Sequence, residues 1–322
     1  MLDGYGRKID YLRISVTDRC NLRCMYCMPE KGIDLIPHEE ILSFEEIFRV
    51  VKSASQLGIN KIRITGGEPL VRVGLPKLIK SIKSLPGIRE VSMTTNGALL
   101  EKHMDELDKA GLDRVNISLD TLNKEKYLRV TRLGDLDKVL RGIKLAIEKG
   151  LTPVKLNVVV TKEINFSEIM DFVKLGEELP LDIRFIELMP IGEGRKFTHV
   201  SNEEIKTAIR KHRELIPCSE VKGSGPAKYF KTPFSQGSIG FISPMSHEFC
   251  GTCNRVRLTS EGFLKLCLHW KTGINLKEFL RSGVKDKELT EIISEAIKGK
   301  PDKHGFISRK VSDGRIMSQI GG

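Results

Sequence analysis

Along the first 190 residues, short segments rich in β-branched residues alternate with longer segments whose apolar residues recur at helical spacing. Two of the longer segments, 43–58 and 134–150, end at glycine, which is typical of a helix C-terminus. Strand–helix units in series predict a parallel sheet. The six predicted strands are 11–18, 61–67, 90–97, 114–120, 154–160 and 182–188. A complete barrel has eight strands, so we expect an incomplete (β/α)6 barrel that is open on one side.

The predicted strands alternate between polar and apolar residues, although parallel strands covered on both faces normally form continuous apolar runs. The apolar parity, for example Ile62, Ile64 and Val158, would pack under the helices. An unpaired charge in a packed core costs several kcal/mol, so the polar parity should line a wet or ligand-filled cavity. An antiparallel sheet with one face in water would alternate in the same way and stays open here. The polar set is Arg13, Ser15, Thr17, Lys61, Arg63, Thr65, Ser92, Thr94, Asn96, Asn116, Ser118, Asp120, Lys155, Asn157, Asp182 and Arg184.

The pattern changes after about residue 195. A helix is predicted near 201–212, followed by a section rich in Gly, Pro and Ser at 221–241. Short strands are predicted within 254–260 and 263–269, and helices within 275–299. This organisation favours two domains, a partial barrel at 1–195 and a smaller α+β domain at 196–322.

Charge and hydropathy restrict the class of protein only slightly. The formal net charge of +11 and the pI near 9.2 favour anionic partners, but a solvated lysine-rich surface explains them as well. No apolar run approaches the roughly 18 residues of a membrane span, and residues 1–10 hold no apolar signal segment. We therefore expect a soluble cytoplasmic protein.

Six of the seven cysteines form two triplets, and this clustering favours reduced, metal-bound thiols over disulfides. The first triplet, Cys20, Cys24 and Cys27, lies in the loop after the first predicted strand. Three thiolates there can reach three corners of an iron–sulfur cube and leave the fourth iron open. Zinc is the alternative, but a structural zinc site wants four ligands and no Cys or His stands at a suitable offset. The lone Cys218 is predicted to be a buried small apolar residue.

Two short motifs carry a family resemblance. "CNLRCMYC" (20–27) after the first strand and "GGEP" (66–69) after the second resemble the radical S-adenosylmethionine (SAM) superfamily. The resemblance implies a [4Fe-4S] cluster on Cys20, Cys24 and Cys27, whose open iron binds SAM. Reductive cleavage of SAM would then give a 5′-deoxyadenosyl radical.

A larger motif set narrows the resemblance. "RISVTDRCNLRCMYCMP" (13–29), "IRITGGEPL" (62–70), "CGTCNRVRLTSEGFLKLC" (250–267) and the terminal "GG" are similar to the GTP 3′,8-cyclase family of molybdenum cofactor biosynthesis. That family converts GTP to 3′,8-cyclo-7,8-dihydro-GTP in the first step of the pathway. The resemblance also implies a second [4Fe-4S] cluster on Cys250, Cys253 and Cys267, in a C-terminal domain that closes the barrel.

The resemblance and the polar parity together predict the site residues. The SAM-binding residues would be Tyr26, Gly67, Ser118 and Met189. The GTP-binding residues would be Arg13, Lys61, Arg63, Thr94, Lys155, Arg184, Arg255, Val256 and Arg257. Arg255, Arg257 and a tail, Gly321 and Gly322, that reaches the active site would act in catalysis. Arginine suits the binding of GTP because its planar guanidinium group matches the geometry of phosphate oxygens.

The resemblance also predicts partner proteins, and two other functions stay open. The resemblance implies a small electron-transfer protein, such as flavodoxin or ferredoxin, and cyclic pyranopterin monophosphate synthase as the next enzyme. A homodimer stays open, and neither a membrane nor nucleic acid is expected as a partner.

The alternative functions are a radical SAM peptide-maturation enzyme with an auxiliary cluster and a zinc-containing nucleic-acid-binding protein. The zinc alternative explains C-x2-C and the basic pI but leaves "GGEP" and the polar strand faces unexplained.

Overall fold

Twelve strands form one sheet in the computed structural model, which describes residues 1–219, 223, 225–247, 249–305 and 315–321. The first six strands follow one another in the sheet, and every neighbouring pair is parallel. This confirms the predicted parallel sheet and excludes the antiparallel alternative. These strands are β1 (Tyr11–Ser15), β2 (Lys61–Thr65), β3 (Glu90–Thr95), β4 (Arg114–Ser118), β5 (Val154–Val160) and β6 (Leu181–Glu187).

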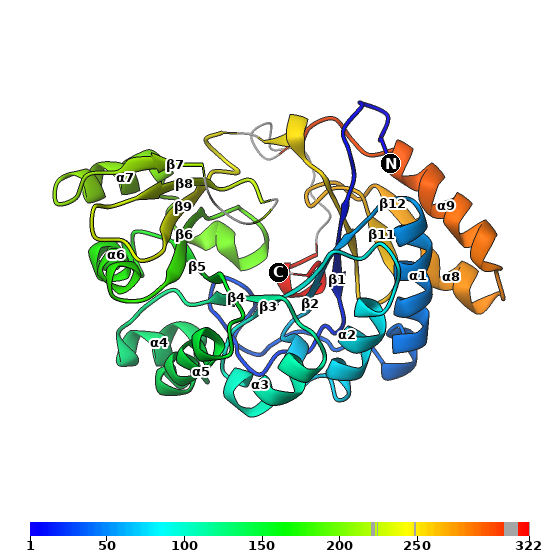
Figure 1. Cartoon of the computed structure of the whole chain (residues 1–322), viewed down its shortest axis with the longest axis horizontal. Helices are drawn as coiled ribbons and strands as arrows, with labels where there is room; N and C mark the ends of the chain where they lie inside the picture. The colour runs from blue at the N-terminus through cyan, green and yellow to red at the C-terminus, as the bar shows by residue number, and fades with distance from the viewer. Residues whose placement is uncertain (220–222, 224, 248, 306–314, 322) are drawn as a thin grey trace.

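Helices cover the outer side of the curved sheet (Figure 1). They are α1 (Phe44–Gln56), α2 (Leu75–Lys83), α3 (Leu100–Lys109), α4 (Lys124–Thr131), α5 (Leu136–Glu148) and α6 (Ile169–Glu178). Short 3-10 turns are η1 (His38–Glu40), η2 (Pro69–Val71), η3 (Phe166–Glu168), η4 (Gly192–Lys196), η5 (Cys250–Thr252) and η6 (Met317–Gln319). A capping box starts α1: Ser43 accepts a hydrogen bond from the Glu46 amide, and the Glu46 side chain accepts one from the Ser43 amide.

The residues after 195 extend the same sheet at both edges. β10 (Arg255–Leu258) pairs in parallel with β1, and β9 (Ser238–Ile242) pairs in parallel with β6. Two antiparallel strands continue each edge: β11 (Phe263–Lys265) and β12 (Gly273–Asn275) beside β10, and β8 (Lys228–Lys231) and β7 (Ile216–Cys218) beside β9. The predicted strands within 254–260 and 263–269 are confirmed. β8 and β9 lie in the Gly/Pro/Ser-rich section, where no strand was predicted.

The predicted C-terminal helices are also present. α7 (Asn202–Arg210) lies within 201–212, and α8 (Leu276–Arg281) and α9 (Asp286–Lys298) lie within 275–299. In the part of the chain that the structure describes, no helix is both long and apolar enough to cross a membrane.

The two parities of the strands face different environments. Ile14, Ile62 and Ile64 are fully buried in one continuous apolar core beneath the helices. The polar parity lies on the other face, where side chains of neighbouring strands meet: Arg63 on β2 donates to the hydroxyl of Ser92 on β3 at 3.2 Å. The end of the described chain lies on this face, beside β1 and β2 (Figure 1). The sheet therefore encloses a polar interior, as the alternation predicted.

Candidate active site

The strand register aligns cationic side chains at the same height in the interior. Arg13 on β1 lies opposite Arg257 on β10 and Arg63 on β2. Two residues earlier on β1, Tyr11 lies opposite Arg255. The guanidinium groups of Arg63 and Arg255 lie over the Tyr11 ring, 5.7 and 5.9 Å from its centroid. Four arginines from three neighbouring strands thus gather around one tyrosine.

Several of these interior groups lack a partner. Among the described residues, the Nε atoms of Arg13, Arg184 and Arg255 and the hydroxyl of Thr94 are buried and have no hydrogen-bond partner. Burial, together with the charge of Arg255, lowers the pKa of Arg257 to about 10. A buried cation is costly unless an anion or acceptors compensate it. The arrangement therefore suits a polyanionic ligand.

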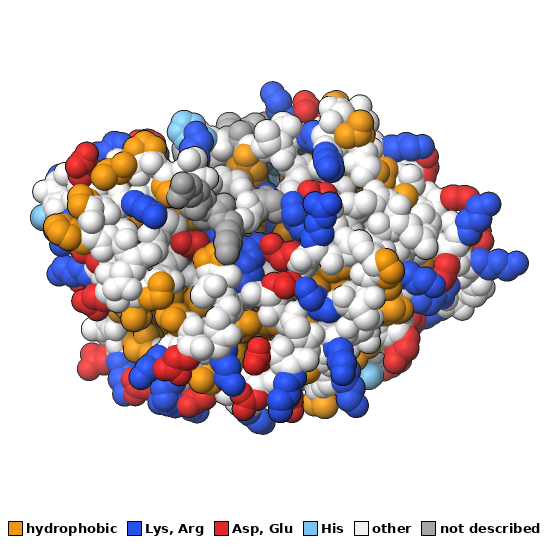
Figure 2. Space-filling model, viewed as in Figure 1, with side chains coloured by type: hydrophobic (Ala, Val, Ile, Leu, Met, Phe, Trp, Pro, Cys, Tyr) orange, Lys and Arg blue, Asp and Glu red, His pale blue; other side chains and the backbone are white. Residues whose placement is uncertain are grey.

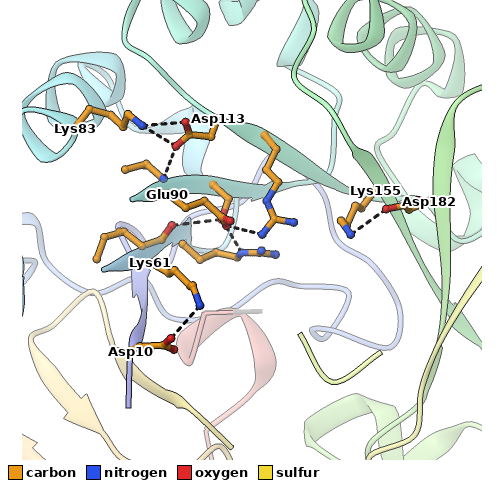
Figure 3. Close-up of polar contacts among 12 residues, drawn as sticks. Asp10, Lys61, Lys83, Glu90, Asp113, Lys155 and Asp182 are labelled. Atoms are coloured by element: carbon orange, nitrogen blue, oxygen red, sulfur yellow. Dashed lines mark hydrogen bonds and ion pairs between the residues drawn. The ribbon is translucent and has the colours of Figure 1, made fainter. Parts of the chain in front are cut away.

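A second polar group lies across the strands on β4, β5 and β6. Lys155 is almost completely buried, and its Nζ lies 2.9 Å from an Asp182 carboxylate oxygen (Figure 3). The same Nζ lies 3.0 Å from the hydroxyl of Tyr229 on β8. With its oxygen turned toward the arginines, the Asn116 amide accepts hydrogen bonds from Arg63 and from Arg184 at 3.1 Å. Tyr229 and Asn116 thus join the predicted set.

Lys61 and Val256 have other surroundings than the remaining predicted GTP-binding residues. Lys61 is partly exposed, and its Nζ forms an ion pair with Asp10 at 2.9 Å, away from Lys155 (Figure 3). Val256 has the opposite parity and is 1% exposed within the apolar core, so its side chain does not face the interior.

The first cysteine triplet follows β1 in a tightly turned loop. The amides of Cys27 and Met28 both donate to the Cys24 carbonyl, at 2.9 and 3.1 Å, and the Met25 amide donates to the Val130 carbonyl on α4. All three cysteines are outside disulfides and partly buried. Burial raises the pKa of Cys20 to about 11 and that of Cys27 to about 12. Such thiols become thiolates when a metal is bound, so this donor set fits an iron–sulfur cluster.

Of the predicted SAM residues, Tyr26 belongs to this loop and Ser118 lies beside it. Tyr26 donates a 2.5 Å hydrogen bond to Asp120, whose pKa burial raises to about 6. Tyr26, Ser118, Asp120 and Cys24 together line a small cavity of about 30 Å³ beside the loop. Asp120 belongs to the polar parity but was not among the predicted site residues.

The GGEP loop packs against the cysteine loop with no room for a larger residue. The Gly67 amide donates to the Thr17 carbonyl at 2.7 Å, and a Cβ on Gly67 would lie 2.3 Å from the Arg19 carbonyl oxygen. Glu68 is fully buried and accepts hydrogen bonds from the Thr95 hydroxyl and the Asn96 amide, both at 2.7 Å. Burial raises the pKa of Glu68 to about 7. Glu68 was quoted within the motif, although sequence reasoning gave it no role.

The second cysteine triplet lies at the opposite end of the strands. Cys253 precedes β10 and Cys267 follows β11, and the antiparallel register puts both at the end where β1 begins. The first triplet follows the other end of β1, and the strand between these ends, Tyr11 to Ser15, is roughly 13 Å long at about 3.3 Å per residue. The interior arginines therefore lie between the two triplets.

The C-terminal segment enters this interior. The Gly321 carbonyl accepts a hydrogen bond from the Thr65 hydroxyl at 2.9 Å, and Arg257 donates to the Ile320 carbonyl at 3.3 Å. Ile320 packs in a small apolar cluster that includes Met189, one of the predicted SAM residues. Arg315 instead forms an ion pair with Glu261 at 2.8 Å. Gly322 lies outside the described residues.

Among the described residues, no three His, Cys, Asp or Glu side chains surround one point as the ligands of a single ion would. In an iron–sulfur cluster each cysteine binds a different iron, so this finding concerns sites of the zinc type.

Two family models match the chain in succession. The model of the radical SAM superfamily matches residues 14–176, and the Molybdenum Cofactor Synthesis C model matches residues 181–306. The chain is 51% identical over 324 residues to a GTP 3′,8-cyclase of Clostridium perfringens (strain 13 / Type A), with 100% of both chains covered. It is 49% identical over 326 residues to a GTP 3′,8-cyclase of Syntrophomonas wolfei, again with 100% of both chains covered.

Solved structures share the fold at low identity. Streptococcus suis SuiB bound to precursor peptide SuiA matches with a TM-score of 0.62 and 17% identity, over 94% of this chain and 67% of SuiB. The SAM-bound form of SuiB matches with a TM-score of 0.61 and 18% identity, over 84% of this chain and 64% of SuiB. At these identities the likeness concerns the fold alone.

Proposed function

This chain belongs to the GTP 3′,8-cyclase family of the radical SAM superfamily, and we propose that it cyclises GTP in the polar interior, between two iron–sulfur clusters. The product would be 3′,8-cyclo-7,8-dihydro-GTP, in the first step of molybdenum cofactor biosynthesis. The observation that carries this proposal is the placement of the interior arginines. They lie between the two cysteine triplets and leave buried donor atoms unpaired.

GTP would be held by the cations that face the interior. The triphosphate suits the forks of Arg13, Arg63, Arg184 and Arg257, because each charge-assisted hydrogen bond contributes roughly 1.5–3 kcal/mol. Thr94, Lys155 and Arg255 complete the proposed binding set, with Tyr229 as the partner of Lys155. Such fixed contacts hold the ribose and base still, which matters because a misplacement of about 1 Å can cost on the order of a hundredfold in rate.

SAM would bind over the loop of the first triplet. Bound to Cys20, Cys24 and Cys27, a [4Fe-4S] cluster would supply the electron that cleaves SAM to methionine and a 5′-deoxyadenosyl radical. Tyr26, held by Asp120, and Ser118 would orient SAM from one side. Gly67 would allow its loop to approach closely, and Met189, packed with Ile320, would keep water out.

The second cluster, the domain division and the tail belong to the same proposal. Cys250, Cys253 and Cys267 would hold the second [4Fe-4S] cluster in a C-terminal unit at 196–322, which completes the partial barrel of 1–195. Gly321 and Gly322 would line the GTP site together with Arg255 and Arg257. The contacts of Gly321 with Thr65 and Arg257 support this role.

Neither alternative function is retained. Identity of 51% over the whole chain to a GTP 3′,8-cyclase speaks against a nucleic-acid-binding protein and outweighs a fold likeness to SuiB at 17%. Lysines and arginines are mixed with acidic residues over the face in Figure 2, so this view gives no continuous basic patch that would support nucleic-acid binding.

The proposed partners follow from the reaction. A flavodoxin or ferredoxin would supply the electron, and cyclic pyranopterin monophosphate synthase would take the product. A homodimer and a cytoplasmic location stay predictions from the sequence.

The direct experiment is anaerobic reconstitution with iron and sulfide, followed by incubation with SAM, dithionite and GTP. We expect 5′-deoxyadenosine and a cyclised GTP product in equal amounts. Replacing Cys20, Cys24 and Cys27 by Ala should remove about half of the iron and all SAM cleavage. Formation of 5′-deoxyadenosine by that triple variant would contradict the assignment of the first cluster.

A further inference from the structure

Lys300 lies behind the second cysteine triplet, just after α9, and is 3% exposed. Its ammonium group donates to the carbonyls of Arg255, at 3.0 Å, and Leu266. Arg255 is two residues after Cys253, and Leu266 directly precedes Cys267. One buried lysine therefore connects the two chain segments that carry these cysteines.

A second buried cation, Arg7, holds the remaining segment. Its guanidinium donates to the Cys250 carbonyl at 3.0 Å and to the carbonyls of Pro301 and Asp302 at 2.7 and 2.8 Å. Arg7 has an anionic partner, Asp3, at 2.6 Å. Lys300 differs here, because no carboxylate forms an ion pair with it among the residues that the structure describes.

An ammonium group buried without a counter-ion is costly, even when carbonyls accept its hydrogen bonds. The nearby negative charge would come from the cysteines themselves, since three thiolates leave a cluster with a net negative charge. Lys300 lies between the segments of Cys253 and Cys267, so its positive charge would be close to these thiolates.

We propose that Lys300 is a positioning residue of the second cluster: it holds the segments of Cys253 and Cys267 together and places a positive charge beside them. This inference rests on the proposed function, which places a cluster on this triplet. Net charge and hydrogen bonds to the sulfurs set the reduction potential of iron–sulfur clusters. A cation in this place stabilises the reduced, more negative cluster, so Lys300 raises the potential at which the cluster accepts one electron.

The test uses the full chain with Cys20, Cys24 and Cys27 replaced by Ala, so that the second cluster alone is observed. Its midpoint potential is measured by anaerobic dithionite titration followed by electron paramagnetic resonance. In this background, Lys300→Met should make reduction at least tenfold less favourable, which is 59 mV for one electron. Lys300→Gln keeps donors for the two carbonyls but removes the charge, and it should shift the potential in the same direction.

Two further variants separate charge from structure. Lys300→Arg keeps the charge and should stay close to the parent potential. Lys298→Met removes an exposed lysine at the end of α9, which pairs with Glu295, and should change nothing. If Lys300→Met and Lys300→Gln lose iron while Lys300→Arg retains it, the charge is needed to hold the cluster, which supports the proposal.

The contrary outcomes are distinct. An unchanged potential in iron-replete Lys300→Met, or loss of iron in Lys300→Arg as well, would overturn the role of the Lys300 charge and leave the proposed function intact. A parent chain that binds no iron at the second triplet would overturn the second cluster itself, and this inference with it.

Discussion

Replacing Arg257 by Met should stabilise the ligand-free protein and weaken GTP binding at the same time. Arg257 is 8% exposed, lies opposite Arg13 and has Arg255 nearby on the same strand. The fall of its pKa from 12.5 to about 10 corresponds to a destabilisation of roughly 3 kcal/mol at neutral pH. This cost is present in full below pH 10 and declines as the pH rises toward 12.5, where the unfolded chain binds more protons than the folded one.

Methionine keeps much of the apolar stem but loses long hydrogen bonds to the Ile320 and Gly321 carbonyls, each worth about 0.5–1.5 kcal/mol. The difference between these two effects leaves the ligand-free variant with a gain of up to about 2 kcal/mol in unfolding free energy. Its dissociation constant for GTP should rise at least tenfold, because a charge-assisted contact of roughly 1.5–3 kcal/mol is lost.

Thermal unfolding of the ligand-free protein and calorimetric titration with GTP measure the two effects. Arg141→Met is the matched control, since Arg141 is an exposed arginine on α5 that pairs with Glu101, and it should change neither quantity. An Arg257→Met protein that is less stable than the parent and binds GTP as tightly would refute the idea that buried, uncompensated arginines form the anion site.

Three further predictions concern the SAM loop and the tail. Gly67→Ala should abolish SAM binding in equilibrium dialysis and retain GTP binding, because the new Cβ would lie 2.3 Å from the Arg19 carbonyl oxygen; unchanged SAM affinity would contradict this. Burial raises the pKa of Asp120 to about 6, so the unfolding free energy of the ligand-free parent should fall by roughly 3 kcal/mol as the pH rises from 3.8 to about 6. Asp120→Asn should abolish this fall, and urea titrations that show the same fall in both proteins would count against the prediction. Deleting Gly321 and Gly322 should leave the iron content and SAM binding intact and abolish GTP cyclisation, and full activity would return the tail to the ordinary behaviour of a frayed end.

Strand alternation predicted most of the interior, because the direction of a side chain in a strand depends only on its position in that strand. Arg13, Arg63 and Lys155 were identified in this way, and the structure places them on the interior face. The same rule gave no information on pairing across the fold. It could not reveal that Asp10 pairs with Lys61, which lies at the start of its strand.

The contributions of distant segments could not be predicted. Tyr229 lies on β8, inside a section whose Gly, Pro and Ser content indicated loops, and it reaches Lys155 only because β8 pairs with β9 and β9 with β6. Lys300 looks like an ordinary surface lysine in the sequence. Its burial depends on the return of the chain to β10 and β11, where it meets the carbonyls beside the second triplet.

In the proposed reaction, the 5′-deoxyadenosyl radical formed over the first triplet abstracts the hydrogen atom at C3′ of the GTP ribose. The most direct test is an anaerobic turnover with SAM, dithionite and GTP that carries deuterium at C3′ of the ribose, followed by mass spectrometry of the 5′-deoxyadenosine. We expect the 5′-deoxyadenosine to gain one deuterium and the nucleotide product to lose it. Unlabelled 5′-deoxyadenosine alongside cyclised product would contradict hydrogen abstraction from C3′ and the placement of GTP on which it depends.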